Sequence, residues 1–444
     1  MKAKVSEKLV SHIWQHQMIT NPVTNAGEQL RIIHPGRVSN DSGCDFKDAV
    51  VTLNGKAIKG NIEIHVKSSQ WYSHGHHQDP KYNSIVLHVV MWHDSSSPTL
   101  LHSGKAIPTI SLDSSLTSPL NKLIHQGKLS HHHSPLCPEA MRYSHTESIN
   151  KLLDAAGEER FIIKTIALQK ALIEEEACQV LFRGIARALG YSKNTEPFEE
   201  LANRLPLSFL EKVEPDTSIV KQAWILGTAG LLPSQQLKQK YNLAKNDEIE
   251  KLENLWQSCG TTETMKKTDW CFFRVRPNNS PTHRLIALSY LITRYQEPGL
   301  LQGIIRLVKS APPETAHCAL VNGLTIAKQD YLAYHHNSGI SKTKNSVLLG
   351  QSKAAAIVIN IILPFSHAWG NIGGDSELRE KAIAIYRRYP KLEDNELTIY
   401  MKQQLQIKPS AAISARQQQG LIHIFNTYCR YRSCHECPVA LSQG

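Results

Sequence analysis

Residues 60–71 of this 444-residue chain read GNIEIHVKSSQW, and this stretch decides the fold of the N-terminal part. Polar and apolar side chains alternate strictly over residues 61–67, which is the period-two pattern of a β-strand. Successive side chains of a strand point to opposite faces, so Glu63, His65 and Lys67 should project together while the aliphatic residues between them pack beneath. The pattern therefore predicts a sheet that carries a carboxylate, an imidazole and an amine on one face.

Further strands are predicted on both sides of this stretch. Upstream, residues 50–53 (VVTL) are followed by Asn54 and Gly55, a pair typical of the tight turn in a hairpin. Downstream, residues 85–91 (IVLHVVM) form a nearly continuous apolar run, as expected of a central strand that is covered on both faces. Residues 107–112 predict one more strand. The N-terminal part is therefore predicted to be an α/β domain.

Helical patterns dominate the rest of the chain. Residues 113–145 are rich in Ser, Pro and His and are predicted to form a linker. From residue 146 onward apolar residues recur at helical spacing, for example from Cys178 to Leu189, where Gly190 is the predicted helix cap. We expect an α+β protein with an α/β domain over residues 1–112, a linker over 113–145, an all-helical domain over 146–428 and a cysteine-containing tail over 429–444.

Composition and the lengths of the apolar segments narrow the class of protein. Hydrophobic residues make up 41% and charged residues 20%, as in a folded protein, and a net charge of +11 suits a polyanionic partner without requiring one. The longest apolar run, residues 354–365, is shorter than the ~20 residues of a membrane span, and residues 1–10 lack the apolar core of a secretion signal. Nine mostly scattered cysteines do not suggest a disulfide framework. We expect a cytoplasmic protein without a membrane partner.

Two acids on neighbouring predicted strands point to metal chemistry. Asp45 lies at a turn-to-strand junction one strand before Glu63, so both carboxylates can bind one hard divalent cation. Such a cation activates water and neutralises charge on a phosphoryl group. The arrangement over residues 28–92 resembles the core of the PD-(D/E)xK nuclease superfamily, in which two acids and a lysine lie on adjacent strands after a helix that often bears a glutamate. The resemblance implies a restriction-endonuclease-like domain, Mg or Mn at Asp45 and Glu63, and Glu28 as the helix glutamate.

The sequence departs from the superfamily pattern at two positions. Cys44 stands where a proline would precede the first acid, and His65 stands where the lysine would follow the second. Lys67 lies two residues further along the same face and is a candidate replacement. We therefore predict that His65 or Lys67 polarises the attacking water or the scissile phosphate.

A longer set of motifs is more specific. The stretch 60–71, the His-Gly-His turn at 74–76, residues 87–90 (LHVV) and residues 274–278 (RVRPN) are the main ones, together with the C-terminal cysteines. In this combination the chain resembles an uncharacterised bacterial family, the domain of unknown function 2851 (DUF2851), over nearly its whole length. This resemblance implies no particular activity.

Histidines and arginines are the candidate substrate-binding residues. His74 and His76 are predicted to line the same cleft and contact phosphate; the alternatives are structural roles, or a zinc site that combines two or three of His74, His76 and His88 with Glu63 or Asp79. Arg274 and Arg276 follow aromatic residues in the segment WCFFRVRP, a combination that suits phosphate oxygens and unpaired bases. Solvated arginines beside core aromatics are the alternative.

Three clustered cysteines end the chain. Cys429, Cys434 and Cys437 have spacings found in zinc knuckles and in iron–sulfur proteins. The fourth ligand would be His435, His423 or Cys137; three ordinary cysteines are the alternative. Some nucleases of the PD-(D/E)xK superfamily carry an iron–sulfur staple that joins one upstream cysteine to a C-terminal trio, and Cys137 would fill that place.

The sequence thus predicts a metal-dependent, nuclease-like protein that hydrolyses phosphodiester bonds of nucleic acid. The alternative is a non-catalytic scaffold that binds nucleic acid or protein through a degenerate nuclease domain. No Gly-x4-Gly-Lys, Gly-x-Gly-x-x-Gly or Gly-x-Ser-x-Gly motif occurs, which disfavours ATPase, nicotinamide dehydrogenase and serine hydrolase classes.

Overall fold

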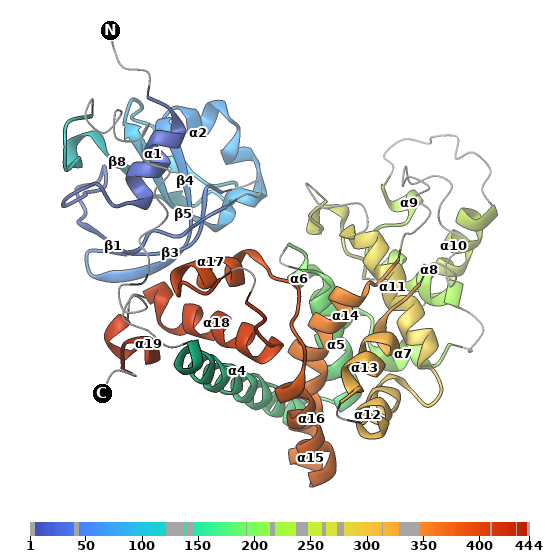
Figure 1. Ribbon diagram of the computed structural model, residues 1–444. Helices are drawn as coiled ribbons and strands as arrows, with labels where there is room; N and C mark the ends of the chain where they lie inside the picture. Colours follow the sequence, from blue (N-terminus) through green and yellow to red (C-terminus); the bar gives the residue numbers. More distant parts are fainter. Residues whose placement is uncertain are drawn as a thin grey trace. The chain divides into compact units, whose positions relative to one another are not determined.

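An N-terminal sheet region is followed by a larger helical region in the computed structural model, as the α+β prediction expected (Figure 1). The structure describes residues 5–39, 44–120, 137, 146–191, 193–213, 218–236, 247–259, 263–272, 279–312, 314–327, 347–408, 411–431 and 433–441. The chain divides into two units. Unit 1 comprises Met1–Leu152, Asn395–Ala411 and Leu421–Gly444, and unit 2 comprises Leu153–Asp394 and Ala412–Gly420.

Unit 1 is built on a mixed sheet with the strand order β1-β3-β4-β5-β8. The first three of these strands are antiparallel, whereas β4, β5 and β8 run parallel, and the short β2 pairs with the start of β3. The strands are β1 (Leu30–His34), β2 (Arg37–Val38), β3 (Phe46–Leu53), β4 (Lys56–Lys67), β5 (Ile85–Trp92) and β8 (Thr109–Ser111). A separate hairpin joins β6 (Thr99–Leu100) to β7 (Ala106–Ile107).

The predicted hairpin turn is confirmed between β3 and β4. Asn54 and Gly55 both have positive φ, 47° and 83°, which is the backbone of the tight turn that matches the twist of two antiparallel strands. Glycine and asparagine adopt this conformation at little steric cost. The turn pairs Leu53 with Lys56 and so sets which side chains of β4 face each way.

Helix α1 (Glu7–Gln15) covers one face of the sheet. Val10, Ile13 and Trp14 are fully buried, and they pack in one cluster with Ile62 and Ile64 of β4. The crossover from β4 to the parallel strand β5 covers the other face with α2 (Gln70–Ser73), η1 (His76–Gln78) and η2 (Pro80–Ser84). Because the middle of β4 is covered on both faces, its polar residues Glu63 and His65 are buried as well as Ile62 and Ile64.

Unit 2 is helical and has one extended apolar core. Its helices include α4 (Thr146–Glu174), which begins in unit 1, then α5 (Ala177–Leu189), α6 (Thr195–Arg204), α7 (Leu207–Glu211), α8 (Ser218–Thr228), α9 (Pro233–Gln236), α10 (Asp247–Gln257), α11 (Pro281–Arg294), α12 (Leu300–Ser310), α13 (Ala316–Leu324), α14 (Gln351–Ile357), α15 (Leu363–Gly373) and α16 (Ser376–Arg388). Gly190 follows α5 as predicted, but its backbone is right-handed. A side chain there would overlap the backbone of Asn194, so close approach is the reason for glycine.

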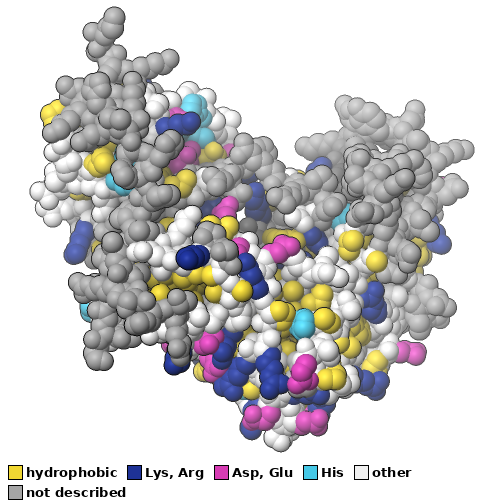
Figure 2. All heavy atoms as spheres, viewed as in Figure 1, with side chains coloured by type: hydrophobic (Ala, Val, Ile, Leu, Met, Phe, Trp, Pro, Cys, Tyr) yellow, Lys and Arg dark blue, Asp and Glu magenta, His cyan; other side chains and the backbone are white. Residues whose placement is uncertain are grey.

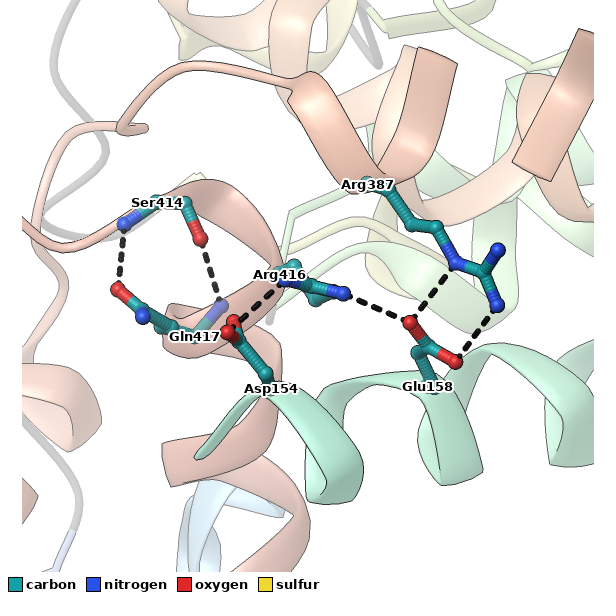
Figure 3. Close-up of polar contacts among 6 residues, drawn as sticks. All are labelled: Asp154, Glu158, Arg387, Ser414, Arg416 and Gln417. Atoms are coloured by element: carbon teal, nitrogen blue, oxygen red, sulfur yellow. Dashed lines mark hydrogen bonds and ion pairs between the residues drawn. The ribbon is translucent and has the colours of Figure 1, made fainter. Parts of the chain in front are cut away.

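An ion-pair network joins three helices within unit 2 (Figure 3). Glu158 of α4 accepts hydrogen bonds from Arg387 of α16 at 2.9 and 3.0 Å, and from Arg416 of α18 (Ala415–Thr427) at 2.7 Å. Arg416 also pairs with Asp154 at 2.9 Å. Helices α4 and α18 come this close because Gly157 has no side chain, and an added methyl group would overlap the backbone of Arg416.

The unit boundaries differ from the predicted domain boundaries. The helical domain was predicted to extend to residue 428. Helix α17 (Glu396–Gln404) and the end of α18 instead belong to unit 1, together with the C-terminal turns. Contacts with the sheet explain this, because the ring of Phe425 lies 5.7 Å from that of His34 and 5.4 Å from the guanidinium of Arg37, while Arg430 pairs with Asp48. Of the predicted linker, only residues 113–120 and Cys137 are described.

Among the described residues one helix has the length and hydropathy of a membrane span, Gln351–Gly373, with 23 residues. It contains the apolar run 354–365 and includes the π-helical turn η8 (Val358–Ile362). Of its most apolar window, 56% is buried inside the protein. This burial is typical of a core helix in a folded domain.

Candidate functional site

The buried face of β4 holds the candidate site. Glu63 and His65 are exposed by only 7% and 1%, and His88 of β5, fully buried, is the register partner of Glu63. Paired residues of neighbouring strands project from the same face. The sheet therefore brings one carboxyl group and two imidazoles together under the crossover that leads from β4 to β5.

Asp45 adds a second carboxylate from the start of β3. Its Oδ2 accepts the backbone N–H of Ile64 at 2.8 Å, and burial raises its pKa. Burial and the charge of Asp45 raise the pKa of Glu63 to about 9, although the backbone amide of Asp45 offsets part of the rise. Within the described part of the chain, Oε2 of Glu63 has no hydrogen-bond partner. The carboxyl pair is thus poorly satisfied by the protein alone.

The glutamate next to this pair is Glu7, not Glu28. The negative charge of Glu7, in the first turn of α1, raises the pKa of both Asp45 and Glu63. Glu28 instead accepts hydrogen bonds from Thr24 and from Asn54, which follows the far end of β3. The eight residues of β3 separate that end from Asp45 by roughly 25 Å. The nuclease resemblance could not point to Glu7, because helix α1 precedes residues 28–92, which carry that resemblance.

A chain of hydrogen-bonding groups crosses the site through His65. Nδ1 of His65 lies 2.9 Å from Nε2 of His88, and its Nε2 lies 3.1 Å from Nε2 of His76. Beyond His88, its Nδ1 lies 3.2 Å from Oγ1 of Thr99. His74 completes a group in which His65, His74 and His76 each offer a ring nitrogen within 4.8 Å of the others. Both nitrogens of His65 are therefore engaged.

His65, His76 and His88 are neutral near pH 7. Burial, followed by the charges of neighbouring histidines, lowers the pKa of His65 to about 2, of His88 to about 3 and of His76 to about 4. His65 therefore carries no positive charge near pH 7. Lys67 is exposed, and its Nζ lies 3.5 Å from Asp94, beyond the end of β4.

Two aromatic residues that the sequence analysis did not select cover the histidines. The Tyr82 ring lies 3.9 Å from that of His76, and the fully buried Trp71 lies 5.3 Å from His76 and 5.1 Å from His88. Burial and the nearby charge of Glu63 raise the pKa of Tyr82. Their position in the crossover between β4 and β5 is the signal that could have identified them, since this segment must cover the strand face.

The cysteines form a second cluster in unit 1. Burial and then the charges of Cys437, Cys137 and Cys434 raise the pKa of Cys429. Burial, and then the charges of Cys137 and Cys434, likewise raise the pKa of Cys437. The fold therefore brings Cys137 near the C-terminal trio, from almost 300 residues away in the sequence. None of the nine cysteines, all of which the structure describes, forms a disulfide.

The predicted arginine contacts, Arg274 and Arg276, lie outside the described residues. On the face seen in Figure 2, Lys and Arg side chains are interspersed with Asp and Glu side chains and do not gather in one basic patch. Ion pairs such as that between Arg388 and Glu314, at 3.0 Å, show the same mixing within unit 2.

Comparisons with known proteins give one result. The family model described as "Protein of unknown function (DUF2851)" matches residues 7–396, which include the whole face of β4 described above. Neither the curated proteins nor the solved structures give a significant match. Because the family match spans most of the chain, this protein belongs to the DUF2851 family.

Proposed function

We propose that this protein is a metal-dependent hydrolase that cleaves phosphodiester bonds of nucleic acid, with Mg²⁺ or Mn²⁺ bound by Asp45 and Glu63. The carrying observation is the buried Glu63 carboxyl group, which lies beside Asp45 and whose Oε2 finds no partner among the described residues. Ionising two neighbouring buried carboxyl groups is unfavourable unless a cation balances them. Oxygen ligands of this kind suit Mg²⁺ and Mn²⁺.

The order of elements supports this proposal. A helix that bears Glu7 comes first, and the antiparallel strands β3 and β4 then carry Asp45 and Glu63. A crossover leads next to the parallel strand β5. This succession agrees with the resemblance to the PD-(D/E)xK nucleases, in which a helix glutamate precedes two adjacent strands that bear the acids.

The residues around the pair have distinct proposed roles. A bound metal ion would supply Lewis acidity and lower the pKa of a coordinated water. His76 borders the carboxyl pair, because its Nε2 lies 3.5 Å from Oε1 of Glu63, and it would line the wall of the site. Asp45 is oriented by the N–H of Ile64 and would hold the metal on the side of β3.

One observation favours the alternative of a non-catalytic binding scaffold. Lys67 pairs with Asp94 and burial keeps His65 neutral near pH 7, so neither candidate for the lysine position places a positive charge beside Glu63. A degenerate nuclease domain would then bind nucleic acid without cleaving it. The two proposals share nucleic acid as the partner and differ in turnover.

Cleavage assays distinguish the nuclease from the non-catalytic scaffold. Single- and double-stranded DNA and RNA are incubated with the full chain and Mg²⁺ or Mn²⁺, and we expect metal-dependent cleavage that Asp45→Asn and Glu63→Gln each abolish. Glu7→Gln should weaken cleavage, whereas Glu28→Gln, the same change at the far end of β3, should not. Retained cleavage in both acid variants would contradict the assignment of the site. Binding without any cleavage would support the scaffold.

We also propose that Cys137, Cys429, Cys434 and Cys437 hold zinc or an iron–sulfur cluster. The residue types support this, because four cysteine thiolates are a common ligand set for both, and the charge of Cys137 affects the pKa of Cys429 and Cys437. We further propose a cytoplasmic location, since the scattered spacing of most of the nine cysteines does not suggest a disulfide framework.

A further inference from the structure

The three-histidine group on β4 and its crossover has the geometry of a metal site in its own right. Nε2 of His65 and Nε2 of His76 are 3.1 Å apart, and His74 brings a third ring nitrogen within 4.8 Å of both. Zinc–nitrogen bonds of about 2.0–2.1 Å in a tetrahedron separate two ligand atoms by roughly 3.3 Å. The two Nε2 atoms are therefore already spaced as neighbouring ligands of one ion.

The hydrogen bonds behind His65 fix the ring for this role. If Nδ1 of His65 donates to Nε2 of His88, the lone pair of His65 lies on Nε2, the atom that points to His76. His88 then donates from Nδ1 to Oγ1 of Thr99, and Thr99 donates to Thr109 at 2.8 Å. Each nitrogen and hydroxyl group in this series of hydrogen bonds then has a partner. Metal-bound histidines are commonly oriented by such outer partners.

The surroundings favour a cation. Oε1 of Glu63 lies 3.5 Å from Nε2 of His76, and Oε2 of this buried carboxyl group has no partner in the described part of the chain. Imidazole nitrogens select zinc and related transition metals over Mg²⁺. His74 is exposed, unlike His65 and His76, so the group opens to solvent on one side. Three protein ligands with one open position are the pattern of catalytic zinc sites.

We propose that His65, His74 and His76 bind a transition-metal ion, with Zn²⁺ the best match, next to the Asp45–Glu63 pair. The Glu63 carboxylate would face both ions, as in two-metal hydrolases whose ions lie about 3.5–4 Å apart. The zinc would supply the positive charge that His65, at the lysine position, does not carry. This inference extends the proposed hydrolytic site, yet zinc binding itself does not depend on cleavage.

Metal analysis of the full chain tests the inference. Protein stripped with chelator is dialysed against Zn²⁺, and its bound zinc is counted beside the His74→Ala variant, which removes an exposed ligand. We expect His74→Ala to bind one zinc fewer than the unaltered chain. His317→Ala is the control, because His317 belongs to unit 2 and contacts Tyr389 there, and it should keep the full count. Equal zinc in the unaltered chain and in His74→Ala would overturn the proposal.

A second variant tests the orientation of His65 without removing a ligand. Thr99→Val keeps the shape of the side chain but deletes the hydroxyl that holds His88. We expect zinc affinity at the histidine group to fall, but by less than the roughly 10–100-fold that loss of a direct outer partner costs, because Thr99 acts on His65 through His88. Unchanged affinity would overturn this part of the argument. Asp45→Asn should stop cleavage but retain the zinc, so failure of the nuclease proposal and failure of the zinc proposal give different results.

Discussion

Replacing Glu63 by glutamine removes a buried group that folding forces to keep its proton. Burial and Asp45 raise the pKa of Glu63 from 4.5 to about 9, whereas the unfolded carboxyl group ionises near 4.5. Between these two pH values the folded chain binds more protons than the unfolded chain, so the stability of the metal-free protein falls as pH rises. Glutamine cannot ionise in either state, and the variant should therefore escape this loss.

The size of the effect follows from the same two pKa values. At pH 7 the unfolded carboxyl group has passed its pKa by about 2.5 units, and each unit corresponds to about 1.36 kcal/mol. Glu63→Gln should thus raise the free energy of unfolding by about 3 kcal/mol at pH 7 in the metal-free protein. The gain should vanish near pH 4.5, grow with pH and level off above pH 9.

Urea unfolding of the full chain at several pH values, in the presence of chelator, measures this gain. A gain that does not change with pH, or a loss of stability at pH 7, would refute the reasoning about Glu63. Adding Mg²⁺ provides the complementary measurement, because an ion that binds only the folded state stabilises it. Mg²⁺ should stabilise the unaltered chain more strongly as pH rises, and it should not stabilise Glu63→Gln.

Three more predictions concern other parts of the molecule. Cys434→Ser should release the metal of the cysteine cluster, as metal analysis would show. The unaltered protein, prepared without oxygen, should be brown if the cluster holds iron–sulfur and colourless if it holds zinc, and metal-free protein would contradict the proposed metal site. Burial and Arg284 lower the pKa of Lys353 from 10.5 to about 7, so the folded chain is destabilised wherever this amine is charged. Lys353→Met should therefore raise the free energy of unfolding most below pH 7 and not at all above about pH 10.5, as urea unfolding would show. Gly157→Ala should lower stability by about 1–3 kcal/mol through overlap with α18, whereas Gly373→Ala, which meets open space, should not; equal melting temperatures would contradict this.

Local patterns were enough to predict most of the elements around the site. The alternation over residues 61–67 predicted β4 because a strand exposes its two faces in turn, and Asn54-Gly55 predicted the hairpin because few residue pairs adopt positive φ twice. The division into a sheet region and a larger helical region followed in the same way from periodicity. These properties depend on residues that are neighbours in the sequence.

Contacts between distant residues were decided only by the tertiary structure. Sequence spacing could not show that Glu7, rather than Glu28, lies beside Asp45 and Glu63, because that depends on how α1 crosses the sheet. Likewise, His76 meets His65 only because the crossover folds back over β4. The packing of the C-terminal helices on the sheet was also invisible to periodicity, since a helix shows its apolar stripe but not the surface that covers it.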